Sequence, residues 1–165
     1  MKLARFIATV CYVGYLRPAP GTWGSLVALP LAWLLHVAGG PLLLGLGIAV
    51  GFLKGVWATA RLTRGQDDHD PSEVVIDEVV GQWIAFFPVS LGAWFAGADI
   101  TALWPGWIVA FLAFRAFDIR KPGPIGWADR REDALGVMLD DVIAGVFAAL
   151  VVIALAGLSH GLMRL

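Results

Sequence analysis

The stretch DDVIAGVFAALVVIALAGLSHGLM, residues 140–163, decides the fold, because two aspartates stand directly before a long run without any formal charge. A helix needs roughly 20 apolar residues to cross about 30 Å of hydrocarbon, so this run is long enough to span a membrane. A carboxylate inside lipid is costly unless it is paired. The acids at the edge of the run therefore need a partner, and carboxylates gathered round a divalent cation remain ionised.

Three more uncharged runs cover residues 25–53, 79–98 and 100–114. The composition agrees, since 59% of residues are hydrophobic, only 15% are charged and the mean hydropathy is +0.77. Soluble domains carry about 25% charged residues. We therefore predict an all-α fold, a polytopic membrane helical bundle that forms a single domain over residues 1–165. The single cysteine, Cys11, excludes an intrachain disulfide.

The N-terminal segment lacks a small-residue cleavage pattern, so we expect no cleavable signal peptide. Residues 2–15 are predicted to form a short helix, which the sequence RPAPG at 17–21 interrupts. Thr22 or Ser25 would then cap a helix that begins near Leu26. The first membrane segment follows from that point.

The uncharged run that follows is too long for one span, and GGP at 39–41 divides it. We predict a hairpin with arms at about 25–38 and 42–60. The remaining segments are read as polar loops at 61–76 and 119–135 and spans at 79–98, 100–118 and 138–160. The bundle would thus contain about five membrane-embedded helices, with the polar loops forming the site.

The charged residues support this topology, because cytoplasmic connections collect Lys and Arg. All basic residues except Lys54 and Arg164 fall on one side in this scheme, and all acids except Asp99 lie in or beside the polar segments of that side. We therefore expect the chemistry at the cytoplasmic face.

The first acidic block is DPSEVVIDEVVG at 70–81. The residues at 70–72 would start a helix with proline in its first turn, which places Glu73, Asp77 and Gly81 on one face. Glu78 is turned by roughly 100° from its neighbour, so a metal would draw on Asp77 with Glu73, or on Glu78 from another helix. The alternative is that these acids only favour the helix dipole.

The second block places Arg115, Asp118 and Lys121 at intervals of three at the end of an apolar helix. A carboxylate between two cations keeps its charge, and arginine and lysine commonly bind phosphate. Pro122 and Pro124 are expected to force an extended turn that orients Lys121. The alternative is simple anchoring by basic residues at the membrane surface.

In the third block Asp141 and Gly145 lie one turn apart on the last span, with Asp140 on the neighbouring stripe. The glycine would let another helix approach closely. The two acids have no basic residue within a turn on their own helix. Arg131 or a Mg²⁺ ion could neutralise them, and we favour the ion.

The loop RPAPGTWGSL at 17–26 adds a different component. Gly21 and Gly24 permit backbone N–H groups to turn inward, and a helix start with Thr22 and Ser25 forms a small anion cradle. The loop lies on the same side as the acids and bases. It is therefore a candidate phosphate-binding element.

Five blocks together carry a family resemblance: GTWGS at 21–25, DPSEVVIDEVVGQWI at 70–84, FRAFDIRKPGPI at 114–125, DRR at 129–131 and GVMLDDVIAG at 136–145. On these blocks the chain resembles bacterial phosphatidylglycerophosphatase A. The resemblance implies a Mg²⁺-dependent phosphatase of the inner membrane. Such an enzyme removes the terminal phosphate of phosphatidylglycerophosphate, giving phosphatidylglycerol and inorganic phosphate.

The residues and the resemblance together lead to a hypothesis for the site. Mg²⁺ would be held by Asp77, Glu78, Asp140 and Asp141. The phosphate would be bound by Arg115, Lys121, Arg131, Thr22 and Ser25. Catalytic roles fall to Asp118 as base and to Asp77 and Asp141, with water attacking in line or, in the rival route, an aspartate nucleophile forming a phosphoenzyme.

The expected partners are phosphatidylglycerophosphate and the lipid bilayer, with no nucleic acid and no obligate protein partner. One alternative is an ion-coupled membrane transporter module, which would place its acids near the middle of the bilayer and not at the mouths of the spans. A phosphotransferase that uses nucleotide-linked lipids would share the acids and the metal. It would show a D-G-x2-A-R motif, which the sequence lacks.

Overall fold

The computed structural model describes residues 1–66 and 68–162. Its elements are α1 (Lys2–Ala8), η1 (Val13–Tyr15), α2 (Pro20–Leu62), α3 (Ile76–Ala96), η2 (Ile100–Leu103), α4 (Trp104–Arg120), α5 (Pro124–Asp129) and α6 (Ala134–Leu162). These described residues contain helices and turns and no strand. The predicted all-α fold is confirmed.

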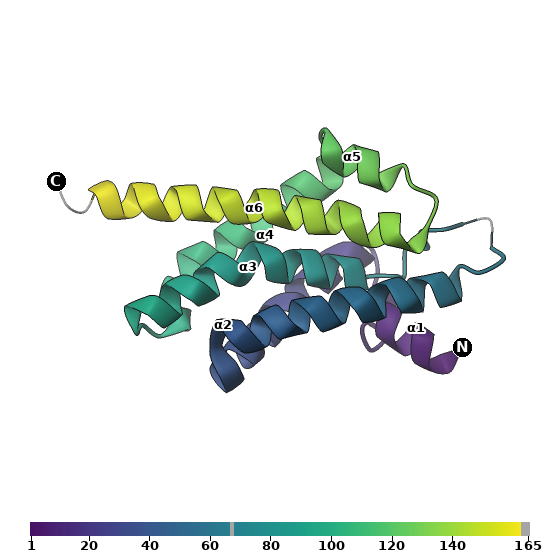
Figure 1. Ribbon diagram of the computed structural model, residues 1–165, viewed down its shortest axis with the longest axis horizontal. Helices are drawn as coiled ribbons and strands as arrows, with labels where there is room; N and C mark the ends of the chain where they lie inside the picture. Colours follow the sequence, from purple (N-terminus) through teal and green to yellow (C-terminus); the bar gives the residue numbers. More distant parts are fainter. Residues whose placement is uncertain (67, 163–165) are drawn as a thin grey trace.

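Helix α2 is bent into a hairpin, which Figure 1 shows as a ribbon that turns back on itself. The bend lies at Gly39 and Gly40, and Gly40 has a φ of 63°, a conformation that favours glycine. The two arms pack closely, since a Cβ atom added to Gly47 would lie 2.9 Å from the Leu35 side chain. The predicted hairpin is therefore present, at the predicted residues.

Four described helices are long and apolar enough to cross a membrane: α2, α3, Ile100–Arg120 and Ala134–Ser159. With the two arms of α2 counted separately, they supply the five helical segments expected from the sequence. Figure 1 shows α1, α5 and the connection between α2 and α3 at one end of the bundle, and the α2 bend and the α3–α4 connection at the other. The predicted position of Arg164 lies outside the described residues.

The N-terminal region differs from the prediction in two ways. Residues 2–15 do not form one helix, because Val10, Cys11 and Tyr12 adopt positive φ angles between α1 and η1. Helix α2 begins at Pro20 and not near Leu26, and it has no side-chain cap. Proline suits a first helical position because its φ is preset and its missing N–H would have had no helical partner.

Helix boundaries on the polar side also differ from the prediction. Helix α3 begins at Ile76 and not at residues 70–72, because the Val75 N–H donates to the Ala8 carbonyl at 2.9 Å and thereby ties this segment to α1. Pro124 starts α5 where we expected an extended turn, again as a first-turn proline.

Helix α3 lies at the centre of the bundle and packs against α2, α4 and α6 (Figure 1). Its contact with α6 is a close backbone approach, since a Cβ atom added to Gly145 would lie 3.1 Å from the Gly81 Cα atom. Small residues at such a crossing allow membrane helices to pack tightly. The crossing brings the starts of α3 and α6, with their acids, to the same point.

Candidate active site

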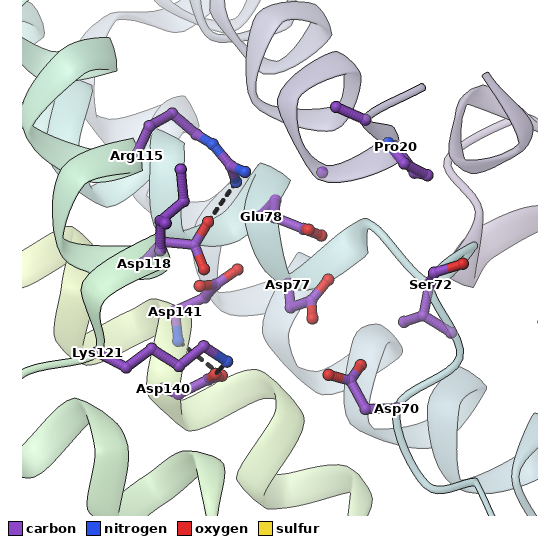
Figure 2. A pocket seen from close by; sticks show the side chains of 14 residues that line it. Pro20, Asp70, Ser72, Asp77, Glu78, Arg115, Asp118, Lys121, Asp140 and Asp141 are labelled. Atoms are coloured by element: carbon purple, nitrogen blue, oxygen red, sulfur yellow. Dashed lines mark hydrogen bonds and ion pairs between the residues drawn. The ribbon is translucent and has the colours of Figure 1, made fainter. Parts of the chain in front are cut away.

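A cavity of about 330 Å³ opens at the polar end of the bundle (Figure 2). Four helices and one loop contribute to its wall. It is lined by Ala19, Pro20, Gly21, Asp70, Ser72, Val74, Asp77, Glu78, Arg115, Asp118, Ile119, Lys121, Asp140 and Asp141. The cavity therefore collects acids and bases from three blocks that are far apart in the sequence.

Three acids form the centre of this cavity. Asp77, Glu78 and Asp141 each offer a carboxylate oxygen, and these three oxygens all lie within 4.8 Å of one another. One oxygen on each carboxyl group is buried without a hydrogen-bond partner among the described residues. Like charges this close are unfavourable unless they are protonated or share a cation. Buried carboxylate oxygens of this kind are the ligands that Mg²⁺ and Ca²⁺ take, so the donor set fits a divalent ion.

The expectation that Asp77 and Glu78 would point apart is wrong. Their Cβ atoms are separated by about 100° around α3, but both carboxyl groups reach the same space. The longer Glu78 side chain bridges the angle. Glu73, the partner expected for Asp77, does not line the cavity.

Two cations complete the polar lining, and both are paired with acids (Figure 2). Arg115 forms an ion pair with Asp118. Lys121 forms ion pairs with Asp129 and with Asp140, the latter at 2.7 Å between Nζ and Oδ2. Burial acts to lower the pKa of Lys121, but the hydrogen bonds and charges of these two aspartates outweigh burial and raise it above its usual value. Lys121 therefore carries a positive charge at every physiological pH.

The start of α2 forms the remaining wall of the cavity through Ala19, Pro20 and Gly21. Gly21 faces the charged groups directly, since a Cβ atom added to it would lie 3.3 Å from Arg115 Nη1 and would also meet the Glu78 carboxylate. Only glycine leaves this space open. The first N–H groups of a helix and its dipole favour an anion at such a position.

Three predicted phosphate-binding side chains lie away from the cavity lining. Ser25 is buried, and its hydroxyl donates to the Gly21 carbonyl at 2.9 Å. Thr22 follows Gly21 but does not line the cavity. Arg131 pairs with Asp133 at 2.8 Å on the exposed surface. The cradle thus presents backbone, and not hydroxyl groups, to the cavity.

Sequence reasoning missed three residues near the site. Asp70 lines the cavity from the loop before α3, and Asp129 pairs with Lys121 from the end of α5. Gln82 is a buried polar residue on α3 one turn after Glu78. All three lie inside blocks that carried the family resemblance, which was the available signal for them.

The model of the phosphatidylglycerophosphatase A family matches residues 6–156 of the chain. The chain belongs to the phosphatidylglycerophosphatase A family. It is 36% identical over 144 residues to phosphatidylglycerophosphatase A of Haemophilus influenzae, a match that covers 86% of this chain and 82% of that protein. The corresponding Escherichia coli protein is 34% identical over 132 residues, covering 79% and 70%. No solved structure matches the chain.

Membership in the phosphatidylglycerophosphatase A family makes the chain a phosphoric monoester hydrolase with the phosphatase activity that the family name states. Its apolar helices associate it with a membrane. Four of the sequence blocks that carry the family resemblance contribute a residue to the cavity lining, namely Gly21, Asp77, Arg115 and Asp141. The pocket is therefore the candidate active site of this phosphatase.

Proposed function

We propose that this protein is a Mg²⁺-dependent phosphatidylglycerophosphatase that works at the cytoplasmic face of the bacterial inner membrane. One observation carries the proposal. Three mutually close carboxyl groups, those of buried Asp77 and Asp141 and of half-buried Glu78, share a cavity with Arg115 and Lys121 at one end of helices that are long and apolar enough to span a membrane. A phosphate monoester attached to lipid must be reached at this depth, by a site that offers both a metal and cations.

In this proposal Asp77, Glu78 and Asp141 hold the metal. When bound, the ion neutralises charge on the phosphoryl oxygens and lowers the pKa of water. Asp140 lies beside the three, but its Oδ2 accepts a hydrogen bond from Lys121. We therefore assign Asp140 first to holding Lys121 toward the cavity.

The phosphate would be bound by Arg115 and Lys121, which line the cavity, and by free N–H groups of the first turn of α2, whose residues Pro20 and Gly21 also line it. Arg115 is already paired with Asp118. A phosphate that engages Arg115 competes with that carboxylate and leaves Asp118 free to accept a proton from the attacking water. Asp118 would thus become available as a base only after the phosphate of the substrate has bound to Arg115.

Exposed apolar side chains on α4 and α5 support a substrate that stays in the bilayer. Ile119 lines the cavity and is 70% exposed, and Trp127 on α5 is 55% exposed. Tryptophan is enriched where hydrocarbon meets the headgroup layer. The polar cavity would therefore open at headgroup depth, with lipid chains beside α4.

The direct test is phosphate release from phosphatidylglycerophosphate by the purified protein, with Mg²⁺ or with a chelator. We expect release with Mg²⁺ and none with the chelator, and the chelated protein should regain activity when Mg²⁺ returns. Equal release under both conditions would exclude a metal-dependent mechanism. Ion flux into sealed vesicles containing the protein would instead support a transporter.

A further inference from the structure

Gln82 on α3 is a fully buried side chain whose amide oxygen and amide nitrogen both lack a hydrogen-bond partner within residues 1–66 and 68–159. A buried amide without a partner is unfavourable, and most buried polar groups in folded proteins are paired. Methionine or leucine would fill the same volume without this penalty. The amide of Gln82 therefore needs an explanation other than filling space in the bundle.

Two other polar side chains of α3, away from the acidic cluster, do have partners. The Trp83 indole Nε1–H donates to the Ala28 carbonyl at 2.9 Å, and the Ser90 hydroxyl lies 2.7 Å from His36 Nδ1. These contacts join α3 to the first arm of α2. Gln82, which directly precedes Trp83 in the sequence, makes no such contact with the described residues. Helix packing alone thus does not account for its amide.

The position of Gln82 relates it to the metal-binding acids. It follows Glu78 by four residues, so the two side chains lie on one face of α3 with Cβ atoms about 5–6 Å apart. Side chains on a helix tilt toward its N-terminus. The Cα–Cβ bond of Gln82 therefore points toward the N-terminal end of α3, the end at which Glu78 and the cavity lie.

The unpartnered atoms around this position are chemically complementary. Glu78 Oε2 is a buried acceptor and Arg115 Nε a buried donor, and neither has a partner among the described residues. Both residues also approach Gly21, which places their head groups near each other. A glutamine amide carries a donor and an acceptor on one group, so it can serve a carboxylate and a guanidinium together.

We propose that Gln82 is a positioning residue, whose amide links the Glu78 carboxylate to the Arg115 guanidinium by hydrogen bonds through bridging water. It would orient Glu78 for the metal and Arg115 for the phosphate. The inference rests on the proposed function, because it gives Glu78 the role of a metal ligand. Partners that orient a metal ligand in this way typically change metal affinity by about 10–100-fold when removed.

The test is a Mn²⁺ titration of the purified, substrate-free protein, followed by the electron paramagnetic resonance signal of free Mn²⁺. Q82M keeps the side-chain volume and removes both polar atoms. T59V is the matched control, because Thr59 is also buried with an unpartnered hydroxyl but does not line the cavity. Thermal unfolding without metal shows that each variant is folded, and Q82L replaces Q82M if the latter is not.

We expect Q82M to bind Mn²⁺ about 10–100-fold more weakly than wild type, while T59V binds as wild type does. A role limited to packing would leave the affinity of Q82M unchanged, and that result would overturn the inference while the proposed metal site stands. Equal weakening in T59V would also overturn it. If wild type binds no divalent ion, the proposed function fails first, and the role of Gln82 fails with it.

Discussion

At the scale of single residues, Asp141 shows what burial does to a carboxyl group. It is 3% exposed, lies close to Asp77 and Glu78, and has an oxygen without a partner in the described chain. Three such groups repel one another when they are ionised and unshared. The same arrangement that weakens the metal-free fold prepares it to bind a cation.

The first prediction concerns this repulsion. D141N should lower the rate of phosphate release by at least about 100-fold, since even partners of metal ligands cost 10–100-fold when removed. Without metal, D141N should unfold at a higher temperature than wild type, because one like charge is gone. D133N is the control, since Asp133 is exposed and pairs with Arg131 outside the cavity. Normal turnover by D141N would contradict its assignment.

The second prediction concerns Lys121, whose raised pKa keeps it charged. K121M should raise KM for the lipid phosphate by about 10-fold or more, because a charge-assisted hydrogen bond is lost and Asp140 is left without its cation. This increase should be the same at about pH 7.5 and at about pH 9, since Lys121 stays charged and a phosphate monoester, with a second pKa near 6, stays a dianion over this range. R120M, an exposed neighbour, is the control, and an equal change in KM there would point to general surface charge.

At the scale of elements, the site depends on how closely α3 and α6 cross. Gly145 on α6 lies against the backbone of Gly81 on α3, one turn from Asp141. No side chain fits between the two helices at this point. Because Gly145 has no Cβ atom, α3 and α6 can approach this closely, and the approach brings the carboxyl groups of Asp77 and Asp141 together.

The third prediction tests this crossing with two glycines of one helix. G145A should destabilise the protein by about 1–3 kcal/mol, as overpacking does, and should weaken metal binding because the helices are forced apart. G157A should do neither, since a Cβ atom added there meets nothing within 4 Å. Thermal unfolding and Mn²⁺ titration measure both effects. Similar behaviour of the two variants would show that the crossing does not control the site.

At the scale of the whole molecule, long apolar helices form the length of the bundle, and the charged side chains that line the cavity lie at one end of it. Basic residues gather at the polar end, and such residues are retained on the cytoplasmic side of membranes. The candidate active site lies at this end. The proposed function therefore expects substrate to enter from the inner leaflet.

The fourth prediction uses Cys11, the single cysteine, which is exposed and follows α1 by three residues. Figure 1 shows α1 at the same end of the bundle as α5. A membrane-impermeant maleimide should leave Cys11 unlabelled in intact cells and label it in inverted membrane vesicles. C11S gives the background for both measurements. Labelling in intact cells with the outer membrane opened would place the cavity on the opposite face.

The sequence by itself determined the class of fold and the members of the site in outline. Uncharged runs must be helical in lipid, because no other segment satisfies its backbone there, and the GGP break at 39–41 predicted the hairpin. Acids and bases at the mouths of spans indicated Asp77, Asp141, Arg115 and Lys121. These inferences needed only local composition and spacing.

Tertiary structure decided what those residues face. Helical spacing alone separated Asp77 from Glu78, but the crossing of α3 and α6 brings both beside Asp141. Arg131 is near the site in sequence and pairs instead with Asp133, while distant Gly21 lies against Glu78. The spacing of residues in the sequence gives only their angles around one helix. A site made by four helices also depends on how closely the helix backbones approach. This approach is set by packing between residues that are far apart in the chain.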